Sequence, residues 1–311
     1  MMILKRLATV LPTLIGVVIV TFLLTRVLPG DPAVYFAGPA ATPQSIAEIR
    51  KSLGLDRPLP DQFAHYVNDL AHGNFGNSLS TGRPVAAEIS SRLPASAELT
   101  LMGLFLAIAI AVPLGIFAAV KQGSLIDHLC RVIATAGVSL PVFFTGLISL
   151  ELFSYKWALF PNVHYVGITS NPLLWARNLV LPWVTLAFLY AALYARLTRA
   201  GMLETMGEDY IRTARAKGLP ERKVIVKHGM RAALTPIVTI FGLDLGLLLG
   251  GAILTETTFS LPGLGQFTIL AIQNQDLPEI QGVVMLAAFF IVIANMIVDI
   301  LYAVVDPRVR F

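Results

Sequence analysis

Charged residues are scarce in this chain. Lysine, arginine, aspartate and glutamate together make up 14% of its 311 residues, whereas hydrophobic residues make up 56%. A soluble globular domain carries about 25% charged and about 45–50% apolar residues, so this chain lacks the polar surface that water requires. The composition therefore excludes a soluble enzyme and a disordered chain, and it predicts a polytopic membrane protein.

The sequence also lacks the common motifs of nucleotide, metal and nucleophile chemistry. Cys130 is the single cysteine, which excludes an intrachain disulfide and a cysteine-based metal cluster. The dipeptide Gly-Lys of a P-loop does not occur, and neither does H-E-x-x-H or G-x-S-x-G. We therefore expect no catalytic residue, no metal and no cofactor on this chain. Any ATP that drives it must be bound by another polypeptide.

Six apolar stretches approach the length of about 20 residues that a helix needs to cross a bilayer. The stretches are residues 7–28, 99–120, 132–153, 179–197, 232–254 and 283–304. Lys5 and Arg6 resemble the basic end of a signal peptide, but the apolar run that follows is too long and no A-x-A site comes directly after it. We therefore expect an all-α membrane protein with six transmembrane helices, the first one retained.

Basic residues are unevenly distributed between the two sides that six spans would create. Residues 196–231 hold nine lysines and arginines, whereas residues 255–282 hold none. The positive-inside rule then places both termini in the cytoplasm, and the net charge of +4 reflects orientation rather than nucleic-acid binding. An aromatic belt is expected at the outer interface, formed by Tyr155, Trp157, Trp175 and Trp183.

A large insertion, residues 29–96, follows the first helix on the outer side. Its helix start and stop signals predict short amphipathic helices on the outer surface. The first is expected from Thr42–Pro43 to Gly54, the second from near Pro60 to Gly73, and the third after Pro84 with Val85, Ile89 and Leu93 on one stripe.

Residues 203–231 predict a polar helix, a sharp elbow and a second short helix. Gly218 suits the end of the first helix, and Pro220 suits the first turn of the next, with Glu221 at its positive end. One interpretation is a rigid basic projection that docks into a partner's groove. The other is an ordinary cytoplasmic loop whose charge only fixes the topology.

The fifth apolar stretch combines small residues with a carboxylate. Gly242, Gly246 and Gly250 form a small-xxx-small pattern that lets another helix approach closely. Asp244 lies on another face of that helix, where it either lines a pore or serves as a hydrogen-bonded structural group. Glu151 and Asn295 are further candidates for the translocation path, and each could likewise be a structural residue instead.

Several segments resemble one family. They are LPGDP at 28–32, GLDRPLPDQF at 54–63, GNFGNS at 73–78, RLPAS at 92–96, DYIRTARAKGL at 209–219, GGAILTETTFSLPGLG at 250–265 and VDILYAVVDPRVRF at 298–311. In this order they resemble the inner-membrane permease subunits of bacterial binding-protein-dependent ABC importers. The likeness is to B-type subunits of the dipeptide/oligopeptide/nickel branch.

The resemblance implies that the elbow contains the coupling helix that docks on the ATPase. The family's EAA signature is matched literally only at Ala214 and Gly218, which bears on individual ATPase contacts more than on membership. The coupling residues that it implies are Ala214, Lys217, Gly218, Leu219, Pro220, Glu221, Arg222, Lys223, Val224, Ile225 and Lys227. Among these, Leu219, Val224 and Ile225 are expected to form an apolar anchor, and Arg222 and Lys223 to steer an acidic groove on the ATPase.

The resemblance also implies the architecture and the partners. We expect a type I ABC importer (MetI-like) permease fold, with a first helix over 1–28, the extracytoplasmic insertion over 29–96 and a core permease domain over 97–311. The implied partners are a second homologous permease, two ATPase subunits carrying ATP and Mg, an external substrate-binding protein and the lipid bilayer. The implied location is the bacterial cytoplasmic (inner) membrane.

Di- or oligopeptides are the favoured substrates. Nickel complexes, glutathione or another small solute remain alternatives, since close relatives of this branch carry all of them. Two alternatives belong to other functional classes. One is an intramembrane aspartyl protease using Asp244 and Asp299, although this sequence lacks the Gly-x-Gly-Asp context of such enzymes; the other is an ion-driven secondary transporter, which would predict inverted repeats.

Overall fold

The computed structural model describes residues 12–23, 33–34, 42–52, 54–160 and 164–305, and the regular structure in these ranges is helical. A short N-terminal helix, Pro12–Leu23, comes first. The elements that follow are α3 (Pro43–Ser52), α4 (Leu59–Ala71), α5 (Val85–Val120), α6 (Leu125–Ser139), α7 (Val142–Ser149), the π-helix η1 (Leu150–Lys156), α8 (Pro172–Met206), α9 (Asp209–Ala216), α10 (Glu221–Lys223), the π-helix η2 (Val224–Gly229), α11 (Met230–Ala233), α12 (Thr235–Leu249), α13 (Ile253–Thr258), α14 (Leu264–Gln273) and α15 (Leu277–Val305).

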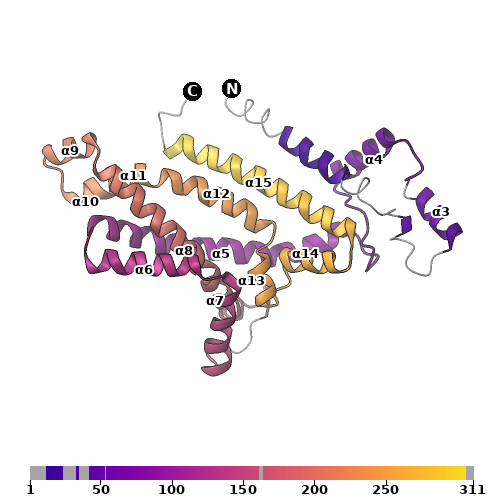
Figure 1. Ribbon diagram of the computed structural model, residues 1–311, viewed down its shortest axis with the longest axis horizontal. Coiled ribbons are helices and arrows are strands. Elements are labelled where there is room, and N and C mark those ends of the chain that lie inside the picture. Colours follow the sequence, from indigo (N-terminus) through magenta and orange to yellow (C-terminus); the bar gives the residue numbers. More distant parts are fainter. Residues whose placement is uncertain (1–11, 24–32, 35–41, 53, 161–163, 306–311) are drawn as a thin grey trace.

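The bundle is elongated, and its two ends carry different elements (Figure 1). The long helices α5, α8 and α15 run along it, and α5 packs against α8 more extensively than any other pair of described helices does. The small helices α9, α10 and α11 lie at one end, whereas α3, α4 and α14 lie at the other. The inserted segment and the basic elbow are therefore separated by the length of the bundle.

Three described helices, α5, α8 and α15, are long and apolar enough to cross a membrane. Two bent pairs raise the number of candidate spans to five if each pair counts as one span. The first predicted span, 7–28, is described only over Pro12–Leu23, so its ends lie outside the described residues.

The prediction of an unbroken helix over 132–153 is wrong. The chain turns by 101° between α6 and the α7–η1 segment, which projects sideways from the bundle (Figure 1). Pro141 lies at the break, and Leu140 before it is extended, with φ −88° and ψ 125°. Proline has no N–H to continue a helical ladder and disfavours helical geometry at the preceding residue, which explains why the helix stops here.

Other boundaries differ from the expected ones. The third short helix predicted in the insertion is not separate, because α5 runs without a break from Val85 to Val120 and crosses the predicted boundary at residues 96 and 97. The span predicted over 232–254 is shorter, since α12 ends at Leu249. Residues 255–282, which separate the fifth and sixth predicted spans, include part of α13, all of α14 and the start of α15.

The first two helices of the insertion form where the sequence predicts them. In α3, Thr42 caps the helix, and its Oγ1 accepts a hydrogen bond of 3.2 Å from the backbone N–H of Ser45. Helix α4 begins at Leu59 and ends at Ala71. Of the residues predicted to form an aromatic belt, Tyr155 and Trp157 are exposed, whereas Trp183 is buried and packs edge-on against Trp175, which does not fit a place in such a belt.

The glycines of α12 lie against α15, whereas the sequence pattern predicts a close helix neighbour without identifying it. A Cβ at Gly246 would lie 2.8 Å from the Cα of Ile291, and one at Gly250 would lie 2.6 Å from the Cβ of Ala287. A Cβ at Gly242 would collide with Val298. Larger residues at these positions would push the two helices apart.

A fully buried carboxylate joins three helices at the α14 end of the bundle. The Oε1 of Glu256 accepts hydrogen bonds from the Oγ of Ser96 (2.7 Å) and the N–H of Ala252 (3.1 Å). Its Oε2 accepts from the N–H groups of Gly265 (2.7 Å) and Gln266 (3.0 Å). These four donors bind α5, α13 and α14 to one side chain. The hydrogen bonds to both carboxylate oxygens offset the cost of burying the charge.

Two other buried carboxylates connect distant parts of the chain. The Oδ2 of Asp276 accepts hydrogen bonds from the Oγ of Ser78 (2.7 Å) and the N–H of Ser80 (2.9 Å), which attaches the inserted segment to the α14–α15 connection. Asp127 accepts two hydrogen bonds from Arg199, 2.6 Å from Nε and 2.9 Å from Nη2, which joins α6 to α8. None of these three carboxylates stands in a pattern that the sequence marks out.

Gly246→Val should destabilise the helix pair, because the new side chain would overlap backbone atoms of α15. Overpacking of this kind costs about 1–3 kcal/mol. Thermal unfolding of the purified protein in detergent measures the effect, and Leu243→Val on the exposed side of α12 is the control. Equal melting temperatures of the two variants would contradict the packing.

Glu256→Gln should also lower stability, because its amide NH₂ replaces one oxygen and leaves one or two buried N–H donors without an acceptor. Each lost acceptor costs about 1–3 kcal/mol. Glu204→Gln, at an exposed position on α8, is the matched control. Resistance to heat-induced aggregation distinguishes them, and a Glu256→Gln protein as resistant as the control would refute the role of this carboxylate.

Candidate functional site

The elbow between α9 and α10 has the local structure that its sequence predicts. Helix α9 ends at Ala216, and Gly218 follows with a φ of +73°, a left-handed conformation that glycine adopts without cost. Pro220 then lies extended just before α10 begins at Glu221. The chain reverses within these few residues and returns toward α8 through η2 and α11.

The elbow has a small apolar core of its own. Ile211, Ala214 and Val224 are buried together, and Leu219 and Met206 pack against them. Val224 is 0% exposed, so the expectation that it forms part of a docking anchor is wrong. It holds α9 against η2 instead, because the tight reversal at Gly218 brings these two elements together.

Ile225 also packs inward. It contacts the cluster formed by Ala119, Met202 and Ala233, which lies where α5, α8 and α11 meet. The close approach of α11 to α8 depends on Gly201, where a Cβ would lie 2.9 Å from the carbonyl oxygen of Ala233. The elbow is therefore packed directly onto the end of α8.

The exposed surface of the elbow is basic and includes the apolar side chains of Pro220 and Val226. Lys217, Pro220, Glu221, Arg222, Lys223 and Lys227 are exposed, and so is Val226, at 51%. Val226 is not among the coupling residues that the resemblance implies. Val226 stands three residues after Lys223, and residues three apart on a helix share a face. This spacing was the sequence signal that Val226 lies on the exposed side.

An exposed ion pair joins α9 to the start of the second helix. Glu221 accepts hydrogen bonds from Arg215, 3.1 Å from Nε and 2.7 Å from Nη2. The bidentate contact spans the elbow and raises the pKa of Arg215 above its ordinary value. Because Glu221 is engaged here, the net charge offered to a partner comes from the lysines and Arg222.

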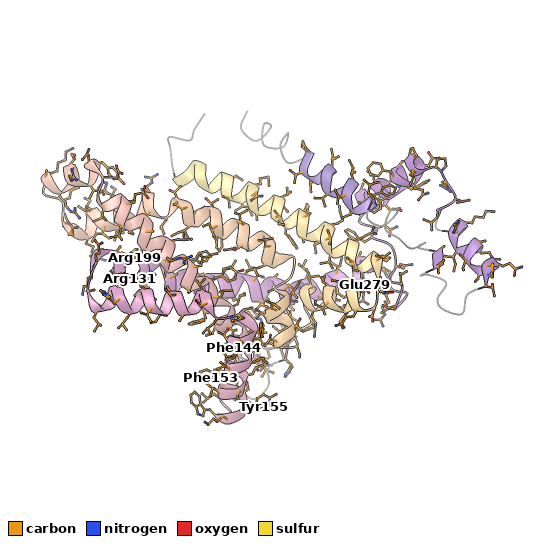
Figure 2. All side chains as sticks on the ribbon, in the orientation of Figure 1. Arg131, Phe144, Phe153, Tyr155, Arg199 and Glu279 are labelled. Carbon is orange, nitrogen blue, oxygen red and sulfur yellow. The ribbon has the colours of Figure 1, made fainter. Side chains whose placement is uncertain are left out.

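The candidate residues for the translocation path lie on three elements. Asp244 on α12 is partly buried, and its Oδ2 accepts a hydrogen bond of 2.7 Å from the hydroxyl of Tyr194, a fully buried residue of α8. Asn295 is exposed on α15, and Glu151 is exposed on η1, in the projecting segment whose Phe144, Phe153 and Tyr155 are labelled in Figure 2. No described hydrogen bond or ion pair joins these three candidates.

Asp244 therefore has a hydrogen-bond partner within the fold and also stays a candidate residue of the translocation path. Its contact with Tyr194 lies on the side of α12 away from the glycines that pack on α15. The side chain of Asp299 lies outside the described part of the structure. Within the described residues, no three His, Cys, Asp or Glu side chains lie together in an arrangement that could hold a metal ion.

Comparison with known proteins identifies the family. The family model of the binding-protein-dependent transport system inner membrane component matches residues 111–311, and the model of its N-terminal component matches residues 1–100. The dipeptide transport system permease protein DppB of Escherichia coli K12 is 41% identical, over 99% of this chain and 98% of its own. A probable peptide ABC transporter permease of Sinorhizobium fredii, y4tP, is 40% identical over 99% of both chains.

A further relative and a solved structure agree with this. A putative peptide transport system permease of Brucella abortus, BAB2_1050, is 41% identical over 100% of this chain and 99% of its own. A chain of the inward-facing MetNI methionine ABC transporter has the same fold, with a TM-score of 0.56 and 18% identity over 70% of this chain and 96% of that chain. Together these findings show that the chain belongs to the inner-membrane permease family of binding-protein-dependent transport systems.

Proposed function

We propose that this protein is one of two membrane subunits of an ATP-driven peptide importer, in which it forms half of the translocation channel. The single observation that carries the substrate class is the 40–41% identity, over essentially the whole chain, to permeases named for dipeptide or peptide transport. An external substrate-binding protein would deliver the di- or oligopeptide. The alternative cargoes are nickel complexes, glutathione or another small solute.

The proposed topology has six spans with both termini in the cytoplasm, in a bacterial inner membrane. The distribution of basic residues supports it, because the elbow at one end of the bundle is rich in lysine and arginine whereas residues 255–282, which contain α14, have none. In this orientation α3 and α4 belong to the extracytoplasmic insertion. The substrate-binding protein would meet the α14 end of the bundle.

The proposed coupling surface is the exposed side of the elbow. Arg222, Lys223 and Lys227 provide positive charge around Val226, and these groups suit an acidic groove with an apolar floor. Two ATPase subunits, which would hold ATP and Mg, would dock here and on the equivalent surface of a second, homologous permease. Because η2 and α11 pack on α8, displacement of the elbow would move α8 with it.

Uptake tests the proposed function. Cells that lack the gene should lose accumulation of a labelled dipeptide, and the cloned gene should restore it. Labelled glutathione and nickel measured in the same strains are the controls for cargo. Loss of nickel or glutathione uptake with normal peptide uptake would contradict the peptide assignment while leaving the transport machinery intact.

Gly218→Val should uncouple the transporter, since a residue with a Cβ adopts the left-handed conformation at a cost of about 1–2 kcal/mol and the elbow would reorient. We expect normal membrane insertion together with loss of the ATPase subunits or of substrate-stimulated hydrolysis. Gly218→Asn is the matched control, because asparagine tolerates this conformation. Full stimulation in the valine variant would show that the elbow only fixes topology.

Asp244→Asn should insert and fold normally, because asparagine is nearly isosteric and still accepts a hydrogen bond from Tyr194. It should alter peptide uptake, because it removes the negative charge from the proposed translocation path. Tyr194→Phe removes the hydrogen bond while keeping the carboxylate. Uptake is measured for both variants at equal protein levels. Unchanged uptake in Asp244→Asn would assign this residue a structural role.

A further inference from the structure

An apolar hollow of about 400 Å³ lies between α5, α6 and α8. Its walls are hydrophobic side chains from all three helices, and no charged group is among them. The larger lining residues are Leu106, Ile110, Leu114, Ile126, Ile133 and Phe188. A hollow with such walls accepts a hydrocarbon chain and offers no partner to a peptide or an ion.

A second hollow of about 220 Å³ adjoins the first and is basic. Cys130, Ala134 and Ala195 line both hollows, so only small side chains separate them. Arg131, Arg196 and Arg199 line the second hollow, and Figure 2 places Arg131 and Arg199 at the end of the bundle near α9 and α10.

Two of the three arginines share one carboxylate, that of Asp127. Asp127 binds Arg199 through two hydrogen bonds and lies 3.6 Å from Arg131. Among the described residues, no carboxylate lies within ion-pair distance of Arg196. Three positive charges and one negative charge leave two positive charges without compensation beside an apolar hollow.

We propose that the two hollows together bind one anionic glycerophospholipid. Arg131 and Arg196 hold its phosphate by charge-assisted hydrogen bonds, and an acyl chain fills the apolar hollow. Basic pockets between transmembrane helices recognise anionic lipid headgroups in this way, and a zwitterionic lipid lacks the net charge that the arginines select. This site is separate from the coupling surface and does not depend on which solute is carried.

Arg131→Gln combined with Arg196→Gln tests the proposal. Arg199 is left intact because its removal would leave the buried Asp127 without its partner. Lipid retained by the purified 311-residue chain is measured by native mass spectrometry, after titration with phosphatidylglycerol, phosphatidylcholine or glycerol 3-phosphate. Arg177→Gln, an exposed arginine near the other end of α8, is the matched control.

Wild type and Arg177→Gln should retain phosphatidylglycerol in preference to phosphatidylcholine. The double variant should bind phosphatidylglycerol about 30-fold more weakly, the combined effect of two arginines at an anionic headgroup. Ala191→Phe, which fills the apolar hollow without changing charge, should weaken both lipids while eluting as a folded protein.

Three outcomes would overturn the proposal. Equal retention of the two lipids by the wild type would remove the charge selectivity. Equal binding of glycerol 3-phosphate and phosphatidylglycerol would show that the apolar hollow takes no part. Cross-links from Cys130 to a second permease subunit in the assembled transporter would show that a protein partner, not a lipid, occupies the hollows.

Discussion

The buried carboxylate of Glu256 is the constraint around which one end of the bundle is organised. A carboxylate without access to water is tolerated only when hydrogen-bond donors surround it, and four donors from three separate segments converge on this one. Ser96 donates to Glu256 and accepts from the N–H of Leu264 at 2.7 Å, so it also orders the start of α14. Small residues are required at Gly263 and Gly265, where a Cβ would collide with the carboxylate or with its surroundings.

The long α5–α8 pair connects that end to the elbow. With 35 residues, α8 extends about 52 Å at 1.5 Å per residue, and its last turns pack against η2 and α11. The buried pair of Asp127 and Arg199 attaches α6 to the same part of α8. A force applied at the elbow therefore acts on a continuous helix rather than on a loop, which is the mechanical property that the proposed coupling requires.

The elbow could be predicted from sequence because its signals are local. Gly218 and Pro220 stand within three residues of each other, and each has a fixed conformational preference that the structure bears out. A close helix contact at Gly242, Gly246 and Gly250 was similarly predictable, since the glycine spacing is itself the determinant, whereas the identity of the partner, α15, was not.

The buried carboxylates were not predictable, because their partners are remote. Ser96 and Glu256 stand 160 positions apart, and nothing near either residue indicates the other. The break at Pro141 does not follow from the length and apolar composition of residues 132–153, which are the two properties that predict a span there; only the proline signals it. The opposite orientations of Val224 and Val226 were missed because the direction of a short helix depends on what packs beneath it.

Site-directed cross-linking at the elbow is the most direct test of the coupling proposal. In a Cys130→Ala background, Val226→Cys presents a thiol on the exposed face, whereas Val224→Cys places one in the elbow's own core. We expect Val226→Cys to cross-link to an ATPase subunit in intact membranes and Val224→Cys not to do so. Labelling of Val226→Cys by a membrane-impermeant reagent added outside the cell, with no cross-link to an ATPase, would contradict the account.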